Sequence, residues 1–293
     1  MTLRKPNFFI LGAPKCGTTS LASWLGEHPN IFMSSYKEPH FFNTDDSRVV
    51  DTIEHYQSFF RGACPEHAAV GEASVWYLSS MHAVCGIVNY VPEARFIVML
   101  RNPVKMAPSL HAEMLFTGME NERDFATAWR LQEDRRVGRM LPASCSVPRR
   151  LLYSDACSLG AQLQRLHTMA PARRVLTILL DDLREDARRE YLRVLRFLDV
   201  PDDGRSAFGI QNASKVRRWP LLVNLSHGIA TVRDRLGMQR GMGLWRRIDA
   251  VNRIEERRQP LLPELEVTLK QFFAADVALL GRLLNRDLRD WVA

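Results

Sequence analysis

The chain has 293 residues, of which 46% are hydrophobic, and a formal net charge of +7. This size and hydrophobic content suffice for a sizeable core, and because no repeat, low-complexity tract or long linker interrupts the chain, one domain over residues 1–293 is predicted. The positive charge mildly favours anionic ligands. No aromatic-interleaved basic tract or recognition motif accompanies it, so no nucleic-acid partner is expected.

The cysteines and the hydropathy pattern indicate the cellular compartment in which the protein is expected. The five cysteines show no C-x-x-C spacing, which argues against a disulfide framework or a zinc site and favours a reducing compartment. No apolar run approaches the ~18 residues of a spanning helix, and the run from Phe8 to Leu11 is too short for a signal-peptide core. The sequence therefore predicts a soluble cytoplasmic protein without a transmembrane segment, and it indicates no oligomeric state.

The stretch FFILGAPKCGTTSLASWLGEHP, residues 8–29, predicts a buried strand, a glycine-bearing turn and a helix. The first N–H groups of a helix lack backbone partners and carry the positive end of the helix dipole, so such a turn favours an anion. Gly12 and Gly17 permit close backbone approach, and Lys15 adds a charge. Three hydroxyl groups at the helix start are further donors: Thr18, Thr19 and Ser20. The turn differs from the G-x-x-x-x-G-K-[ST] nucleotidase pattern, because Lys15 precedes Gly17.

The next segments predict three more strand regions. NIFMSSYKEPHFF reads as a short strand running into a loop, where Pro39 blocks a helix and restricts Glu38 to extended geometry. AVGEASVWYLSS predicts a strand and a turn. Residues 96–100 form the clearest buried strand and end at Arg101, and Pro108 is expected in the first turn of the following helix.

The second half of the chain is mainly helical in pattern. Helices are predicted over residues 122–140, 153–171 and 189–200, and the region from 262 to 291 is predicted to be helical throughout. RRVLTILLDDL, residues 173–183, predicts one more parallel strand. Strands alternating with helices indicate a parallel sheet covered on both faces, with its ligand site beyond the carboxyl ends of the strands.

Polar clusters follow three of these strands, at residues 15–20, 37–40 and 101–109. The spacing between Arg101 and Ser109 lets the first residue leave a strand and the second lie in the next helix, so both can reach one anion. Two separate anion sites then suggest a nucleotide with phosphates at both ends.

Several motifs, in order, resemble those of one family. They are GAPKCGTTSL, KEPHFF, GEASVWYL, LRNPVKMAPS, ILLDDL, FLDV and LLNRDLRDW. The chain resembles the sulfotransferases that use 3′-phosphoadenosine 5′-phosphosulfate (PAPS), particularly the bacterial and heparan-sulfate-type branch. The resemblance implies a P-loop-like three-layer α/β fold with a central parallel sheet flanked by helices. The chain departs from the family pattern at Ala73, Met106 and Pro108, which affects the fine contacts around the acceptor.

The resemblance implies in-line transfer of a sulfuryl group from PAPS to an acceptor hydroxyl or amine, without a metal, leaving adenosine 3′,5′-bisphosphate (PAP). Lys15 would sit at the bridging oxygen and the 5′-phosphate. The N–H groups that would hold the remaining oxygens belong to Cys16, Gly17, Thr18, Thr19 and Ser20. Arg101 and Ser109 would bind the 3′-phosphate. The loop QNASKVRRW, with Arg217 and Arg218, would fold over the nucleotide.

On the acceptor side, Glu38 would act as general base. His40 and Phe41 would contact the acceptor. We expect Phe41 and Phe42 to exclude water beside Glu38, which favours a carboxylate of raised proton affinity. The acceptor is not specified: carbohydrate, lipid and small natural product all stay open.

Other interpretations stay open from the residues alone. Lys15 can be a solvated loop lysine, Glu38 can merely pair with Lys37 or cap a helix, and the loop QNASKVRRW can be surface charge. His40 or His111 can replace Glu38 as base, and Cys16 at a helix start can be a nucleophile. Two other functions compete: a P-loop-type small-molecule kinase, which should show a Walker lysine and a magnesium carboxylate, and a non-catalytic polyanion-binding module with steep salt dependence.

Overall fold

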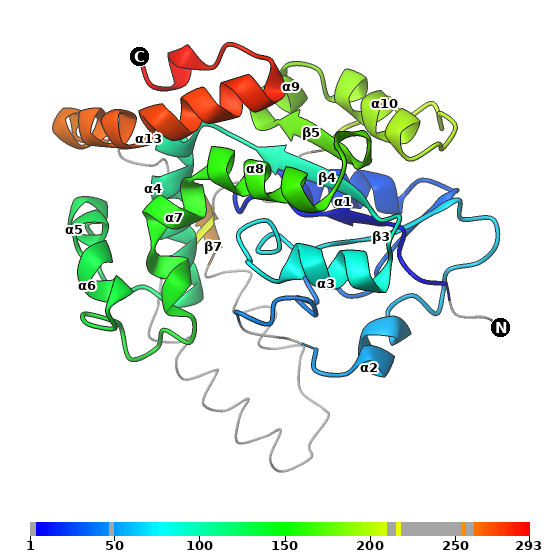
Figure 1. Ribbon diagram of the computed structural model, residues 1–293, viewed down its shortest axis with the longest axis horizontal. Helices are drawn as coiled ribbons and strands as arrows, with labels where there is room; N and C mark the ends of the chain where they lie inside the picture. Colours follow the sequence, from blue (N-terminus) through cyan, green and yellow to red (C-terminus); the bar gives the residue numbers. More distant parts are fainter. Residues whose placement is uncertain (1–3, 47–49, 210–214, 218–252, 256–260) are drawn as a thin grey trace.

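The computed structural model describes residues 4–46, 50–209, 215–217, 253–255 and 261–293. At its centre is a five-stranded parallel sheet in the order β2-β3-β1-β4-β5 (Figure 1). The strands are β1 (Phe8–Ile10), β2 (Ile31–Met33), β3 (Ala69–Ala73), β4 (Arg95–Leu100) and β5 (Val175–Leu179). The predicted parallel sheet and its five strand regions are thus confirmed.

Burial explains why these runs form the sheet. Every residue of β1 and β3 is buried, as is β4 beyond its first residue, and such continuous apolar runs are typical of parallel strands covered on both faces. The central strand β1 pairs with β3 on one side and β4 on the other. Because the strands are parallel, the loops that follow β1, β3 and β4 all leave at the same edge.

Helices cover both faces of the sheet, with α3 and α8 on one face and α1 on the other (Figure 1). The first helices are α1 (Thr18–Gly26), α2 (Ile53–Ser58), α3 (Ala83–Tyr90), α4 (Pro103–Thr117), α5 (Phe125–Arg130) and α6 (Gln132–Arg136). They are followed by α7 (Tyr153–Cys157), α8 (Leu159–Met169), α9 (Leu180–Glu185), α10 (Ala187–Phe197) and α13 (Pro263–Leu284). The 3-10 turns are η1 (Pro148–Leu151), η2 (Ala172–Arg174) and η3 (Arg289–Trp291).

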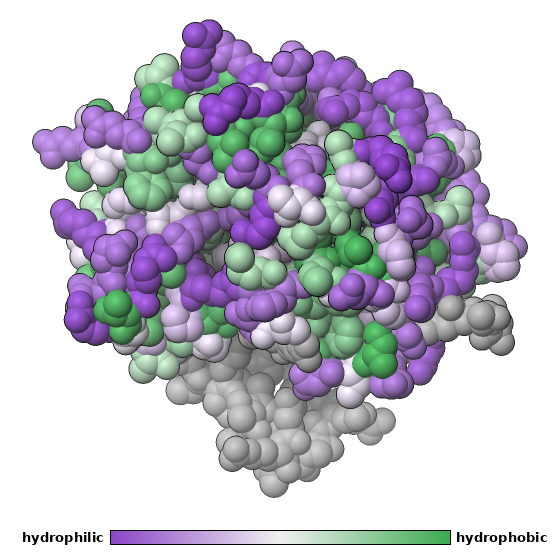
Figure 2. Space-filling view, viewed as in Figure 1, coloured by the Kyte–Doolittle hydropathy of each residue, from purple (hydrophilic) through white to green (hydrophobic). Residues whose placement is uncertain are grey.

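A short antiparallel pair, β6 (Lys215–Arg217) and β7 (Arg253–Glu255), lies outside the main sheet, with β6 against α4. The surface in Figure 2 is hydrophilic over most of the face shown, with smaller hydrophobic patches between the charged side chains. Within the described ranges, no helix has the length and apolar character needed to cross a bilayer.

Three long helix predictions were too simple. Residues 122–140 form the two short helices α5 and α6, and residues 153–171 break at Ser158, between α7 and α8. The C-terminal region is not helical throughout, because α13 ends at Asn285 in left-handed geometry (φ 49°), a common helix stop.

The start of α4 also differs from the prediction. Asn102 caps the helix by accepting hydrogen bonds from the backbone N–H groups of Val104 (2.8 Å) and Lys105 (3.4 Å), and Pro103 occupies the first turn. Pro108 therefore lies in the helix interior, and the prediction that it would sit in the first turn was wrong. Ser109 follows it on the buried side of α4.

Candidate active site

The glycine turn, residues Gly12–Ser20, connects β1 to α1. Gly17 precedes the helix in left-handed geometry (φ 87°), and no side chain of the residues described here caps the helix start. A Cβ added to Gly12 would lie 1.9 Å from Thr18 Cγ2, so any side chain at this position would displace Thr18 at the helix start. The N–H of Ser20 donates to the carbonyl of Gly17 at 3.1 Å, and an uncapped helix start of this kind favours an anion. Anion binding by the turn stays a prediction.

Lys15 stands within this turn and is ion-paired. Its Nζ donates to Glu113 Oε2 at 2.8 Å. Glu113 comes from α4, four residues after Ser109, which places both on one side of that helix. Sequence reasoning missed Glu113, although its helical spacing from Ser109 was a usable signal.

The hydroxyl and thiol groups of the turn have distinct surroundings. Thr18 and Ser20 are buried, while Thr19 Oγ1 accepts a hydrogen bond from Lys37 Nζ at 2.7 Å. Burial raises the pKa of the Cys16 thiol to about 12. The thiol is thus neutral at physiological pH, and the alternative of a Cys16 nucleophile loses its basis.

The two residues expected at the 3′-phosphate behave differently. The guanidinium of Arg101 donates to the carbonyl of Lys15 at 3.1 Å and so supports the glycine turn. Ser109 is fully buried, and its Oγ has no hydrogen-bond partner among the described residues. A buried polar atom left unpaired costs about 1–3 kcal/mol, so this hydroxyl fits a site that a ligand completes.

The base segment, Lys37–Asn43, lies at the end of β3. Glu38 and His40 both adopt left-handed geometry (φ 56° and 50°), so the prediction of extended geometry at Glu38 was wrong. The backbone N–H of Glu38 donates to the carbonyl of Ala73 at 3.1 Å, and that of His40 donates to Ser74 Oγ at 3.3 Å. These bonds to residues distant in sequence fix the loop against the local preference that Pro39 imposes.

The side chain of Glu38 contacts both neighbours in the segment. Its Oε1 lies 3.6 Å from Lys37 Nζ and its Oε2 lies 3.3 Å from His40 Nε2. Burial pushes the pKa of Glu38 upward, but the hydrogen bonds and charges of His40 and Lys37 outweigh it and lower that pKa below its ordinary value. The expected raised proton affinity was therefore wrong, and Glu38 is ionised at neutral pH.

The remaining residues of the base segment face the core. His40 is buried, with Asn43 Nδ2 3.4 Å from its Nδ1. Phe41 stacks on Tyr56 with ring centroids 4.7 Å apart, and Phe42 packs edge-on against the same ring. The shielding of Glu38 by these two rings stays a prediction.

The alternative base His111 and the loop QNASKVRRW are the remaining predicted parts of the site. His111 is buried, its Nε2 lies 2.8 Å from the carbonyl oxygen of Glu122, and burial lowers its pKa. This contact gives His111 a structural role in holding the loop after α4. Arg217 belongs to β6, which lies against α4, but its side chain is outside the described part of the structure, as are the whole of Asn212, Ser214 and Arg218.

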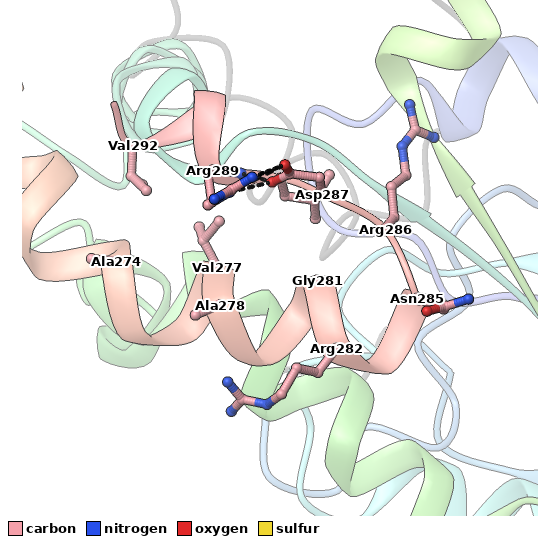
Figure 3. Close-up of a pocket in the computed structure, with 11 residues that line it drawn as sticks. Ala274, Val277, Ala278, Gly281, Arg282, Asn285, Arg286, Asp287, Arg289 and Val292 are labelled. Atoms are coloured by element: carbon pink, nitrogen blue, oxygen red, sulfur yellow. Dashed lines mark hydrogen bonds and ion pairs between the residues drawn. The ribbon is translucent and has the colours of Figure 1, made fainter.

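A groove of about 470 Å³ runs along the end of α13 and η3, where Arg282, Arg286 and Arg289 are close to its rim (Figure 3). None of the predicted site residues lines it. Arg286 pairs with Asp182 of α9, and Arg289 pairs with Asp287.

Among the residues that the structure describes, no three His, Cys, Asp or Glu side chains cluster as metal ligands would.

The parallel sheet, with a cationic glycine turn and a carboxylate segment at its carboxyl edge, defines a P-loop-like α/β protein. The sequence pattern of the family described as "Sulfotransferase domain" matches residues 5–208. A solved sulfotransferase from Alicyclobacillus acidocaldarius is similar over 99% of this chain and 100% of its own, with 26% identity and a TM-score of 0.72. The chain belongs to the sulfotransferase family.

Curated relatives match over shorter segments. Membrane-associated sulfotransferase kil1 of Dictyostelium discoideum is 32% identical over 106 residues, which are 36% of this chain and 22% of that protein. Carbohydrate sulfotransferase 15 of Mus musculus is 29% identical over 160 residues, covering 40% of this chain and 28% of the relative. The matches thus span less than a third of these relatives' own lengths.

Proposed function

We propose that this chain, acting as one domain, transfers a sulfuryl group from PAPS to an acceptor hydroxyl or amine. The observation that carries the proposal is the Lys37 ammonium, which joins Thr19 of the glycine turn to Glu38 of the base segment. It brings an anion-binding turn and an ionised carboxylate to one edge of the sheet. That is the arrangement required to hold an anionic donor beside a proton acceptor.

The donor side has the groups that PAPS requires. The uncapped start of α1 and Lys15 would hold the 5′-phosphosulfate, and Arg101 with the unpartnered hydroxyl of Ser109 would hold the 3′-phosphate. Bound PAPS supplies the activated sulfuryl group. Lys15, now paired with Glu113, would neutralise the negative charge that develops on the leaving phosphate oxygen.

The acceptor side depends on Glu38. Its carboxylate is ionised at neutral pH and 29% exposed, so it can accept the proton of an incoming hydroxyl or amine. General base catalysis of this kind contributes about 10²–10⁴-fold to the rate. His40 donates toward the same carboxylate and orients it, so the alternative role of His40 as the base itself is not needed.

The acceptor class is inferred from relatives alone. Two relatives are named for carbohydrate and heparan sulfate substrates, a carbohydrate sulfotransferase and a heparan sulfate N-deacetylase/N-sulfotransferase. We propose a hydroxyl-bearing acceptor, with carbohydrates as the first class to examine. Lipid and small natural-product acceptors form the comparison groups.

The test supplies labelled PAPS and a panel of acceptors to the purified full chain and measures sulfate incorporation. Lys15→Ala is expected to lower turnover at least about 100-fold without unfolding the protein. Lys270→Ala is the matched control, because Lys270 forms a similar ion pair with Glu266 (2.9 Å) on α13. Near-normal turnover in Lys15→Ala would contradict the proposal, and thermal stabilisation by ATP but not by PAP would indicate a kinase instead.

A further inference from the structure

A buried carboxylate beneath the base segment has no part in the mechanism so far. Glu72 lies on β3 and is fully buried. It accepts three hydroxyl hydrogen bonds: from Tyr56 (2.7 Å) and Tyr77 (3.1 Å) to Oε1, and from Ser74 (2.8 Å) to Oε2. These donors come from α2 and from the turn that follows β3. Burial raises the pKa of Glu72 to about 7 against the lowering effect of the three hydrogen bonds, so the ionised form is present at and above neutral pH.

Two of these hydroxyls also hold the base segment. Ser74 Oγ accepts the backbone N–H of His40, and the hydroxyl of Tyr77 accepts the backbone N–H of Phe42, both at 3.3 Å. A hydroxyl has one proton to donate and lone pairs with which to accept. Ionised Glu72 can only accept hydrogen bonds, so the hydroxyls of Ser74 and Tyr77 both direct their protons toward it. The oxygen lone pairs of these two hydroxyls then stay available to the N–H groups of the loop.

The loop requires such external support. Glu38 and His40 are non-glycine residues in left-handed geometry on either side of Pro39, a conformation that persists only where the surroundings over-determine it. The backbone bond from Glu38 to Ala73 fixes one end of this stretch. The hydroxyls of Ser74 and Tyr77 fix the backbone N–H groups of His40 and Phe42, further along the same loop.

We propose that Glu72 is a positioning residue: through Ser74 and Tyr77 it sets the backbone geometry that aims the Glu38 carboxylate. The proposal rests on the proposed role of Glu38 as base. A neutral amide at position 72 would keep one acceptor oxygen and present an N–H donor in place of the other, so at least one of the Ser74 and Tyr77 hydroxyls would lose the acceptor that draws its proton away from the loop. Glu72→Gln should therefore impair turnover although it conserves shape.

Tyr77 and Tyr56 offer a matched pair for the test. Both rings are buried and both hydroxyls donate to Oε1 of Glu72, but only the Tyr77 hydroxyl also bonds the base segment. Tyr77→Phe is expected to lower kcat about ten-fold or more, with the Kd for PAP within two-fold of wild type. Tyr56→Phe is expected to leave kcat within about two-fold.

Ser74→Ala tests the connection from Glu72 through Ser74 to His40 and replaces Tyr77→Phe if that variant does not fold. It is expected to show the same loss in kcat and an unchanged Kd for PAP. Combining Tyr77→Phe with Glu38→Gln should cause less than two-fold further loss, because both act on one step. Equal losses in Tyr77→Phe and Tyr56→Phe, or no loss in Tyr77→Phe and Ser74→Ala, would overturn the positioning role. Full turnover in Glu38→Gln would instead overturn the proposed base.

Discussion

The glycine turn and the base segment lie at the same edge of the sheet but are completed differently. Within the described part of the chain, the helix start in the glycine turn has no side-chain cap, and Ser109 Oγ, on the proposed donor side, is buried without a partner. In the base segment the N–H groups of Glu38, His40 and Phe42 all bond to β3 or to the turn after it.

This difference indicates that the two regions control different steps, ligand binding and the chemical reaction. The donor side is left open for a ligand to satisfy, so its residues should mainly control nucleotide affinity, except Lys15, whose charge also acts on the leaving group. The acceptor side is organised by the protein itself before any ligand arrives, so its residues should mainly control the chemical step. Substitutions that separate Kd from kcat test this division directly.

The largest effect is expected from the acceptor side. Glu38→Gln retains shape and hydrogen bonding but cannot accept the proton, so kcat should fall about 100-fold or more. Calorimetry should show the Kd for PAP unchanged. His40→Asn should cost far less, because His40 only orients the carboxylate.

A pH profile adds a second check on Glu38. His40 and Lys37 lower its pKa below the ordinary value of a glutamate despite burial, so the active, ionised form persists as pH falls and is lost only in the acid range. Burial raises the pKa of Glu72 to about 7, so protonation of that positioning residue can itself give an acid limb near neutral pH. A limb near neutral pH that persists in Glu72→Gln, or a dead His40→Asn with an active Glu38→Gln, would show that another residue is the base.

The next largest effect is expected from Arg101. If it binds the 3′-phosphate, Arg101→Ala should weaken PAP about ten-fold or more while weakening adenosine 5′-phosphate much less. Calorimetry with the two ligands measures both. Equal losses would mean that Arg101 acts only through its hydrogen bond to the Lys15 carbonyl, as a support of the glycine turn.

A smaller effect is expected from Ser109. Its hydroxyl is buried and has no partner among the described residues, so Ser109→Ala removes the cost of that group and should raise the free energy of unfolding by about 1–3 kcal/mol. PAP affinity should nevertheless fall several-fold. Unfolding titrations and calorimetry on the same variant supply both values, and unchanged PAP affinity would remove Ser109 from the donor site.

The smallest effect is expected from Glu113, and it has the opposite sign. Glu113 is ion-paired with Lys15, so its negative charge opposes an anionic ligand at the same place. Glu113→Gln should tighten PAP binding about two- to five-fold, as expected for a partly exposed charge. Weaker PAP binding would mean that Glu113 holds Lys15 in position for the nucleotide.

How far the sequence could predict the molecule depended on the range of the interactions. Strands such as Phe96–Leu100 were found because burial on both faces leaves a continuous apolar run. The start of α4 was misplaced although its signal, Asn102 followed by Pro103, was local and readable. Glu113 was equally within reach of helical spacing.

The geometry of the base segment was out of reach for a physical reason. Pro39 alone favours extended backbone at Glu38, but the observed conformation depends on Ala73 and Ser74, more than thirty residues away. The pKa of Glu38 likewise depends on where His40 and Lys37 lie around it. Neither arrangement leaves a pattern in the local sequence.

The buried thiol of Cys16 has a practical consequence for work at the bench. With its pKa near 12 and no exposed surface, it resists alkylation and oxidation, whereas Cys85 on α3 is exposed to reagents. Inactivation by a thiol reagent would therefore report damage elsewhere and give no reason to assign a catalytic cysteine. A maleimide dye directed at Cys85 would label the protein while leaving the glycine turn chemically intact.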